Sequence, residues 1–330
     1  MPRVAVMGAG SWGSAFALVL ADAGNEVVIW SRHREVAEAI NTNHHNPRYL
    51  QQALLPESVR AVVDPAEAMA GADAVVLAIP SQTIRQNLAT WAIPADTAVI
   101  SLAKGIETGT GLRMSQVIAE SGVPEEFIAV VSGPNLADEI AARQPAASVV
   151  ACTDAERGKR VQRLCLTSNF RPYTVTDVVG CELAGATKNA IALAVGMGVG
   201  MGLGANAQAS VITRGLAETT RLGEALGADP HTFAGLAGMG DLVATCSSAL
   251  SRNRSFGELL GKGRSVAEAT EASRGVAEGV RSSASILALA REHGVDMPIV
   301  AGVVEVIEGR LLPSTAITAL MARELKAERG

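Results

Sequence analysis

A lysine set in an apolar helical pattern is the first residue of this chain whose surroundings suggest chemistry. The segment Glu182-Leu-Ala-Gly-Ala-Thr-Lys-Asn189 runs into a long apolar stretch, so Lys188 is expected to point into a partly dry site. Ala184 and Gly185, on the same helix face, leave room beside the ammonium for a substrate. Burial lowers the pKa of a lysine and makes proton transfer near neutral pH feasible. A lysine that buries only its stem while its charge reaches water is the alternative.

Two further segments of the second half combine polar groups with glycine or a helix start. Gly238-Met-Gly-Asp241 sets a carboxylate before Leu-Val-Ala-Thr-Cys246, where Asp241 could hold Lys188 or a substrate hydroxyl, or serve simply as a helix N-cap. Ser251-Arg-Asn-Arg254 brings hydroxyl, guanidinium and amide donors before a capped helix expected to begin near Ser255. Such donors are typical of a phosphate site, and a solvated basic loop is the alternative.

A glycine-rich turn near the start predicts a dinucleotide site. Gly8-x-Gly10-x-x-Gly13 follows the apolar run Val4–Met7 and precedes a helical pattern. The first glycine makes a tight turn, the second admits a pyrophosphate, and the third lets the helix press on the strand. The motif alone is weak in a chain with 33 glycines, and an ordinary glycine-rich turn is the alternative. Its position directly after a strand favours dinucleotide binding.

The end of the second expected strand bears on which dinucleotide binds. An NAD-specific fold usually has an acidic residue there, about 20 residues beyond the glycines, which holds the ribose 2′-hydroxyl. Here the strand runs into Ile29-Trp-Ser-Arg-His-Arg34, with no acid at its tip. Arg32 or Arg34 suits a 2′-phosphate, or is a solvated arginine at a helix start. The sequence therefore favours NADP(H) over NAD(H), with tolerance of both plausible.

A fourth polar candidate, Lys104-Gly105, comes just past the expected carboxyl end of a strand. Ligands of open parallel sheets lie at that edge. Together with the glycine turn and the segments around Lys188, Asp241 and Ser251, it suggests hydride transfer on a small phosphorylated carbonyl compound.

The elements that must position these residues fall into two regions. Up to about Tyr173, short apolar strands alternate with helical patterns, which predicts a parallel sheet covered on both faces. Helix starts include Asp64-Pro-Ala-Glu67 and the capping box Thr153-Asp-Ala-Glu156. The expected strands are Val4–Met7, Val27–Trp30, Val59–Val63, Ala74–Ile79, Ala98–Leu102, Ile128–Ser132, Ser148–Ala151 and Phe170–Val175.

Beyond about Thr176 the strand signal ends and helical patterns continue. The capping boxes expected there are Ser255-Phe-Gly-Glu258 and Ser265-Val-Ala-Glu268. We expect an α/β Rossmann-type dinucleotide domain with a parallel-rich sheet over residues 1–176 and an all-helical domain over residues 177–330. The expected helices cover 178–203, 205–226, 255–261, 265–273, 276–293, 298–308 and 314–327.

Composition excludes several other classes of protein. The 330 residues are 48% hydrophobic and 18% charged, typical of a globular chain, and the net charge of −5 argues against nucleic acid or an anionic membrane as partner. The four cysteines and five histidines show no metal-ligand spacing, so no metal is expected and the thiols are read as reduced, in a cytoplasmic protein. The apolar start resembles a signal peptide only faintly, and the run Ala190–Ala205 is too short for the ~20 residues of a membrane span.

Taken with their order, these motifs resemble those of bacterial NAD(P)-dependent glycerol-3-phosphate dehydrogenases over nearly the whole chain. The resemblance rests on the glycine turn, on Val131-Ser-Gly-Pro134, on the Lys188 segment, and on Gly235-Leu-Ala-Gly-Met-Gly-Asp-Leu-Val-Ala-Thr-Cys246 with Ser251-Arg-Asn-Arg254. It implies reversible reduction of dihydroxyacetone phosphate to sn-glycerol 3-phosphate, a precursor of membrane phospholipids. It further implies a helical domain of the 6-phosphogluconate dehydrogenase type and a homodimer built on it.

The resemblance also implies roles for individual residues. Lys188 would be the catalytic acid and base. The substrate would contact Lys104, Gly133, Asn135, Lys188, Asp241, Ser251, Arg252 and Asn253. The cofactor would contact Gly8, Gly10, Ser11, Trp12, Gly13, Arg32, His33, Tyr49, Lys104, Ala137, Arg252, Val276 and Glu278. Asn135 departs from the family, which often has Ser or Thr there, although an amide can still donate a hydrogen bond.

Two alternatives remain open from sequence. One is another dehydrogenase with the same two-domain plan, of the 3-hydroxyacid or 6-phosphogluconate type, against which the 235–254 block argues. The other is a nucleotide-sensing protein that has kept the fold and lost the chemistry. The presence of both Lys188 and Asp241 disfavours it.

Overall fold

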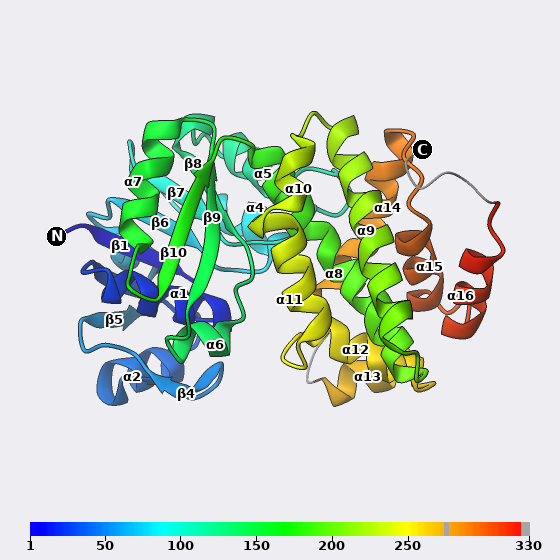
Figure 1. Ribbon diagram of the computed structural model, residues 1–330. Helices are drawn as coiled ribbons and strands as arrows, with labels where there is room; N and C mark the ends of the chain where they lie inside the picture. The colour runs from blue at the N-terminus through cyan, green and yellow to red at the C-terminus, as the bar shows by residue number, and fades with distance from the viewer. Residues whose placement is uncertain (274–276, 325–330) are drawn as a thin grey trace.

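A sheet covered by helices adjoins a bundle of helices in the computed structural model, which describes residues 1–273 and 277–324 (Figure 1). The main sheet has eight strands in the order β10-β9-β8-β7-β6-β1-β2-β5. The change of direction from β1 toward β2 on one side and β6 on the other creates the crevice in which doubly wound sheets bind ligands. The strands are β1 (Arg3–Met7), β2 (Glu26–Trp30), β5 (Val59–Val62), β6 (Ala74–Leu77), β7 (Ala98–Ser101), β8 (Ile128–Ser132), β9 (Ala146–Cys152) and β10 (Phe170–Val175).

All eight strands expected from the apolar runs are present, and the parallel-rich sheet is confirmed. One neighbouring pair, β8 and β9, is antiparallel, because a run of buried residues predicts a strand but not its direction. A small hairpin of β3 (His45–Asn46) and β4 (Leu50–Leu54) was not expected. Strand β3 has only two residues, both polar, and β4 (Leu-Gln-Gln-Ala-Leu) does not alternate between apolar and polar residues, so neither gives the signal on which strand prediction depends.

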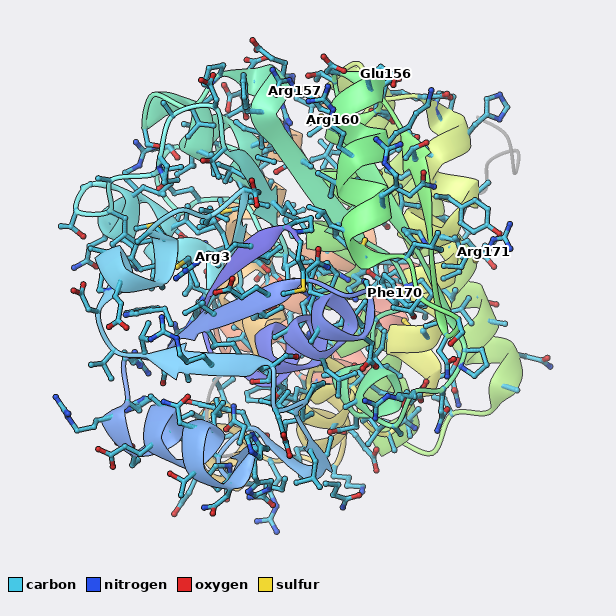
Figure 2. All side chains as sticks on the ribbon, turned by 90° about the vertical axis from the view of Figure 1, so that its left-hand side faces the viewer. Arg3, Glu156, Arg157, Arg160, Phe170 and Arg171 are labelled. Atoms are coloured by element: carbon cyan, nitrogen blue, oxygen red, sulfur yellow. The ribbon has the colours of Figure 1, made fainter. Side chains whose placement is uncertain are left out.

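Helices cover both faces of the sheet. One apolar layer packs around Phe16 and Phe170 and includes side chains of α1 (Ser11–Asp22), α2 (Arg34–Asn43), α6 (Ala137–Ala141) and α7 (Ala155–Cys165). The other includes side chains of α3 (Pro65–Met69), α4 (Ile84–Leu88) and α5 (Met114–Glu120). Charged side chains of α7, Glu156 and Arg160 among them, extend from the outer surface (Figure 2).

The helical half is arranged around α8 (Val178–Gly200), which is long and apolar enough to cross a membrane by length and composition alone. In its most apolar window 83% of the residues are buried inside the protein, as in a core helix. The remaining helices are α9 (Ala205–Ala225), α10 (Pro230–Ala234), α11 (Asp241–Ser247), α12 (Arg252–Gly261), α13 (Val266–Ala272), α14 (Glu278–Glu292), α15 (Pro298–Ile307) and α16 (Pro313–Met321).

Glycines allow α8 and α12 to approach closely. A Cβ added at Gly196 would lie 2.0 Å from the carbonyl oxygen of Arg254, and one at Gly257 would lie 2.2 Å from that of Leu193. Neither backbone could keep its place beside a larger residue. These two glycines therefore bring α12 into close contact with the middle of α8.

Several helix boundaries differ from expectation because competing caps occur nearby. Helix α12 begins at Arg252 with Ser251 as its N-cap, so the cap expected at Ser255 is wrong. Asp154, and not Thr153, caps α7 by accepting from two backbone N–H groups. The cap at Asp64 and the box of Ser265 with Glu268 are confirmed. Helices α10 and α11 are too short to show a helical period; α10 was not expected, and α11 was suggested only by the possible N-cap at Asp241. The division at residues 176 and 177, between β10 and α8, stays a prediction.

Candidate active site between the two halves

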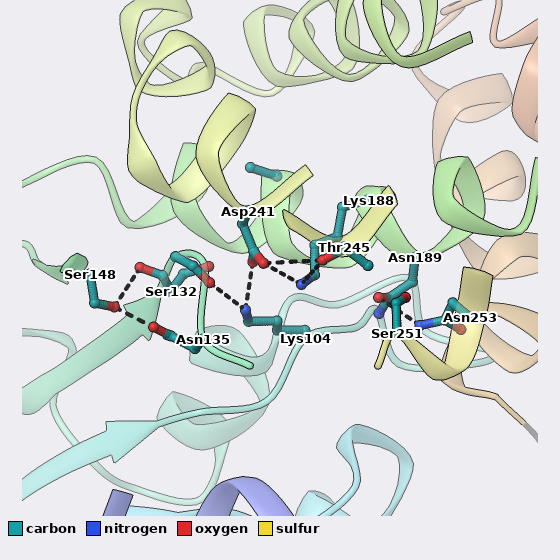
Figure 3. Close-up of polar contacts among 12 residues, drawn as sticks. Lys104, Ser132, Asn135, Ser148, Lys188, Asn189, Asp241, Thr245, Ser251 and Asn253 are labelled. Carbon is teal, nitrogen blue, oxygen red and sulfur yellow. Dashed lines mark hydrogen bonds and ion pairs between the residues drawn. The ribbon is translucent and has the colours of Figure 1, made fainter. Parts of the chain in front are cut away.

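A buried carboxylate joins two lysines where the sheet meets the helical bundle (Figure 3). Asp241 accepts a hydrogen bond from the ammonium of Lys188 through Oδ1, and one from Nζ of Lys104 at 2.5 Å through Oδ2. Nζ of Lys188 also donates to Oγ1 of Thr245 at 2.8 Å, and Nζ of Lys104 donates to the carbonyl of Gly133 at 3.2 Å. The cluster thus contains two positive charges and one negative charge.

Burial strengthens the interactions among these charges and shifts the pKa of Lys188. Asp241 is 1% exposed and Lys188 8% exposed, so water screens neither group strongly. The pKa of Lys188 is lowered to about 8, mainly by burial and also by the ammonium of Lys104, while Asp241 acts in the opposite direction. An ammonium with a pKa in this range can give up its proton near neutral pH and regain it.

Three segments far apart in sequence supply the cluster. Lys104 follows β7 at the carboxyl edge of the sheet, Lys188 lies in the middle of α8, and Asp241 begins α11 after a π-helical turn at Leu236–Gly240. Gly240 occupies the N-cap position of α11, so the interpretation of Asp241 as an N-cap is wrong. Its carboxylate is directed at the lysines instead.

The space beside Gly185 is used differently from the expectation. A Cβ there would meet the side chain of Lys104 at 3.3 Å and Oγ of Ser132 at 3.2 Å. The stem of Lys104 therefore fills the room that the sequence suggested for a substrate. Gly185 serves the site indirectly, because it lets Lys104 cross α8 and reach Asp241.

An amide chain lies on the α12 side of Lys188. Asn253 donates through Nδ2 to Oδ1 of Asn189 at 2.9 Å and accepts through Oδ1 from the backbone N–H of Gly279 at 2.9 Å. Both asparagines are buried, so each fixes the other's orientation. Ser251 caps α12, the side chain of Arg252 is exposed at its first turn, and Glu278 is exposed at the first residue of α14. Val276 lies outside the described residues.

Unpaired polar atoms lie on the opposite side, in the loop after β8. Asn135 donates to Oγ of Ser148 at 3.2 Å, and Ser148 donates to the carbonyl of Ser132 at 2.9 Å. Oδ1 of Asn135 and Oγ of Ser132 are buried without a partner among the described residues. A buried polar group without a partner usually marks a place where a ligand or water completes the hydrogen bonding. The amide at position 135 thus keeps a free acceptor.

Glu182 ties α8 to the sheet-containing half. Its carboxylate accepts from the backbone N–H of Ser115 at 2.7 Å, from Oγ of Ser115 at 2.5 Å and from Arg113 at 2.6 Å. These groups lie at the first turn of α5, so a carboxylate from one half of the molecule caps a helix of the other. The loop between Lys104 and Arg113 also buries Ile106 in the apolar core of the helical half. Both contacts fix Lys104 relative to Lys188.

The glycine turn fits a pyrophosphate. Gly8 has a φ of +132°, and a Cβ at Gly13 would lie 2.1 Å from the carbonyl oxygen of Gly8. A Cβ at Gly10 would meet nothing within 4 Å, and no side chain caps the first turn of α1. Its N–H groups are therefore available to an anion. Nε1 of Trp12 is buried without a partner among the described residues, beside the exposed Ser11.

The tip of β2 gathers positive side chains. Nε of Arg32 lies 3.0 Å from Nε2 of His33, and Arg48, from the unexpected hairpin, approaches the same nitrogen at 3.2 Å. Tyr49 is half-buried in that hairpin, below the guanidinium of Arg48. Glu35 reaches Nδ1 of His33 at 3.6 Å, so a carboxylate does stand near the tip, supplied by the first turn of α2. Ala137, the first residue of α6, packs against the α1 side of the sheet.

The structure thus brings Lys104, Gly133, Lys188 and Asp241 into one hydrogen-bonded cluster, with Asn253 on its flank. Sequence reasoning missed Thr245, Asn189 and Glu182, although the spacing Asp241-x-x-x-Thr245 on one helix face was a usable signal. No group of three or more His, Cys, Asp or Glu side chains suited to a metal occurs in residues 1–273 and 277–324, and all four cysteines are buried and free.

Comparison with known proteins identifies the family. Residues 3–158 match the model described as the N-terminus of NAD-dependent glycerol-3-phosphate dehydrogenase, and residues 177–318 match its C-terminus. Proteins named glycerol-3-phosphate dehydrogenase [NAD(P)+] from Streptomyces griseus and Thermobifida fusca are each 60% identical, and the alignments cover 99% and 100% of this chain and 98% and 99% of theirs. A crystal structure of glycerol-3-phosphate dehydrogenase from Coxiella burnetii is 35% identical, with a TM-score of 0.92 over 98% of this chain and 99% of that one. The chain therefore belongs to the NAD-dependent glycerol-3-phosphate dehydrogenase family.

Proposed function

We propose that this protein catalyses the NAD(P)H-dependent, reversible reduction of dihydroxyacetone phosphate to sn-glycerol 3-phosphate, which supplies glycerophospholipid synthesis. The observation that carries the proposal is the buried Lys188–Asp241–Lys104 cluster at the carboxyl edge of a dinucleotide-binding sheet. Family membership gives the substrate class, a small phosphorylated compound.

Lys188 is the proton donor in this proposal. Asp241 and Thr245 hold the ammonium from one side, which leaves its direction fixed while burial lowers its pKa to about 8. A bound NAD(P)H supplies the hydride to the carbonyl carbon. Lys188 gives its proton to the carbonyl oxygen, and in the reverse direction it takes the proton from the C2 hydroxyl. The ammonium of Lys104 stabilises negative charge that develops on that oxygen.

The start of α12 is the phosphate site in this proposal. Ser251, Arg252 and Asn253 offer hydroxyl, guanidinium and amide groups at a helix N-terminus, where the helix dipole favours an anion. Gly133 and Asn135 border the substrate on the other side. Because the close packing of α12 on α8 fixes this region relative to Lys188, binding the phosphate would orient the carbonyl.

The cofactor site in this proposal runs from the glycine turn to the interface of the two halves. It comprises Gly8, Gly10, Ser11, Trp12, Gly13, Arg32, His33, Tyr49, Lys104, Ala137, Arg252, Val276 and Glu278, as expected from the sequence. The cations at the tip of β2 favour NADP(H), with NAD(H) also accepted.

We further propose a cytoplasmic homodimer built on the helical half. Large exposed hydrophobic side chains support this assembly: Leu312 is 69% exposed and Met321 81% exposed, both near the carboxyl end of the described chain. Burying such side chains against a second copy is favourable. Sedimentation equilibrium of the purified protein tests the assembly, and a monomer at micromolar concentration would contradict it.

A turnover assay tests the function. Purified protein is mixed with dihydroxyacetone phosphate and NADPH, then with NADH, and loss of reduced-cofactor absorbance is followed. We expect turnover with both, and far less with unphosphorylated dihydroxyacetone, because the α12 site then holds nothing. Turnover on 3-hydroxyacids or 6-phosphogluconate in the oxidative direction would favour a related dehydrogenase, and none on any of these with either cofactor would contradict the proposal.

A further inference from the structure

The hairpin of β3 and β4 is fixed directly to the glycine turn. Asn46, fully buried, donates through Nδ2 to the carbonyl of Ala9 at 2.9 Å and to Oγ of Ser14 at 2.8 Å. Its Oδ1 accepts from the backbone N–H groups of Arg48 at 3.3 Å and Tyr49 at 3.1 Å. One buried amide thus locks the hairpin turn to the expected pyrophosphate site, and Arg48 is carried on a rigid support.

Arg48 completes a charged group at the tip of β2. Its Nη1 lies 3.2 Å from Nε2 of His33 and 3.7 Å from Oε1 of Glu35, and its guanidinium lies 5.4 Å from the centre of the Tyr49 ring. Arg32 approaches the same histidine nitrogen at 3.0 Å. Because both guanidinium groups can only donate, Nε2 must accept, which leaves the proton of a neutral His33 on Nδ1, facing Glu35.

The position of the Glu35 carboxylate bears on which cofactor group can bind beside it. In the structure it is the carboxylate that faces His33 and Arg48. A phosphate in this position would take the same partners with more charge and more acceptor oxygens, and it would repel Glu35. A ribose hydroxyl, in contrast, would leave Glu35 in place and could donate to it.

We propose that Arg48 is a determinant of cofactor choice alongside Arg32 and His33, and that Glu35 opposes it. Arg48 binds the 2′-phosphate of NADP(H), whereas Glu35 penalises that phosphate and accepts from the 2′-hydroxyl of NAD(H). The balance of this pair sets how far the protein discriminates between the two cofactors. This inference rests on the proposed function, because it assumes that the glycine turn binds a dinucleotide.

The test measures dissociation constants for NADPH, NADH and 2′,5′-ADP by titration calorimetry, without turnover. We expect Arg48→Ala to raise the dissociation constants of NADPH and 2′,5′-ADP about tenfold, since it removes a charge-assisted contact. The dissociation constant of NADH should change less than about twofold. We expect Glu35→Gln to tighten NADPH by about two- to threefold and to weaken NADH slightly, because exposed charge pairs contribute little each.

A matched control separates local from general effects of charge. Lys159 and Glu156 on α7 form an ion pair with exposed fractions of 50% and 72%, close to the 49% and 68% of Arg48 and Glu35. Lys159→Ala should leave all three dissociation constants unchanged. Equal effects of Arg48→Ala on NADPH and NADH, or no effect on either, would overturn the inference while leaving the function intact. Failure of the unmodified protein to bind either cofactor would instead overturn the proposed function.

Discussion

The glycine turn and the lysine–aspartate cluster bind their expected ligands by opposite physical means. The turn offers backbone N–H groups and open space. The charged side chains beside it at the tip of β2, Arg48 and Glu35, are largely exposed. The cluster is made of side-chain charges from three distant segments, with Lys188 and Asp241 buried and Lys104 partly buried. Exposed pairs exchange partners at little energetic expense, whereas a buried charge cannot lose its partner without a large penalty. Substitutions should therefore have much larger effects in the cluster than at the tip.

Apart from loss of Lys188 itself, the largest effect is expected from Asp241→Asn. This change leaves Lys104 and Lys188 facing each other without a carboxylate, and an unpaired buried charge costs several kcal/mol. We expect kcat to fall on the order of a thousandfold. Steady-state kinetics and urea unfolding measure both consequences. A kcat within a few-fold of the original would show that the buried carboxylate is dispensable. Substitutions in the cluster would then have no larger effect than those at the tip of β2.

Two glycine substitutions distinguish the roles of the turn. Gly13→Ala places a Cβ 2.1 Å from the carbonyl oxygen of Gly8, so α1 must shift, and we expect loss of stability with cofactor affinity reduced on the order of a hundredfold. In Gly10→Ala the added Cβ meets no protein atom within 4 Å, so the melting temperature should not change. The affinity for the cofactor should still fall. Calorimetry and thermal unfolding of both variants check this. Equal stability losses would contradict the assignment.

A smaller effect is expected at the clamp between the two halves. Glu182→Gln retains an acceptor for Ser115 but not for Arg113. The position of α8 relative to the loop that carries Lys104 is then less well fixed. We expect kcat to fall about tenfold with little change in cofactor affinity, because small misplacement of reacting groups is enough. The effect of Arg113→Ala should be less than additive with it. The exposed glutamate of the α13 capping box provides a control, Glu268→Gln, which should leave kcat unchanged.

The smallest effect concerns pH. Because burial lowers the pKa of Lys188 to about 8, the group loses its proton on raising the pH through that value, well before an ordinary lysine does. The reduction needs the protonated form. We therefore expect kcat for reduction of dihydroxyacetone phosphate to fall about twofold from its low-pH value near pH 8, and to fall further above that pH. Oxidation of glycerol 3-phosphate should rise over the same range. A flat reduction profile up to pH 10 would contradict this role of burial.

The two regions also differ in what the sequence could predict. The glycine turn is local, so its spacing and the preceding strand were enough to place Gly8, Gly10 and Gly13. The segments around Lys188, Asp241 and Ser251 were recognisable as polar groups in apolar surroundings. That Asp241 could hold Lys188 was one of the stated possibilities, and it is confirmed. The second partner of Asp241, Lys104, was not expected, because its contact depends on a π-helical turn before Asp241 and on the passage of Lys104 beside Gly185 of α8.

Contacts made across long sequence separations account for what was missed. Arg48 reaches the tip of β2 because Asn46 ties a short hairpin to the glycine turn, and no periodicity in the sequence reveals such a hairpin. Glu182 looked like part of the lysine segment, yet its partners are on a helix of the other half. Strand direction between β8 and β9 likewise follows from tertiary packing and not from the apolar runs.

The most direct test of the account is the substitution Lys188→Ala with two readouts. Turnover of dihydroxyacetone phosphate with NADPH should be lost by at least about a thousandfold, because no other described proton donor occupies that position. The dissociation constant of NADPH should stay within about threefold of the unmodified protein, because the glycine turn and the tip of β2 remain intact. Turnover near the original rate would contradict the assignment of Lys188 as proton donor.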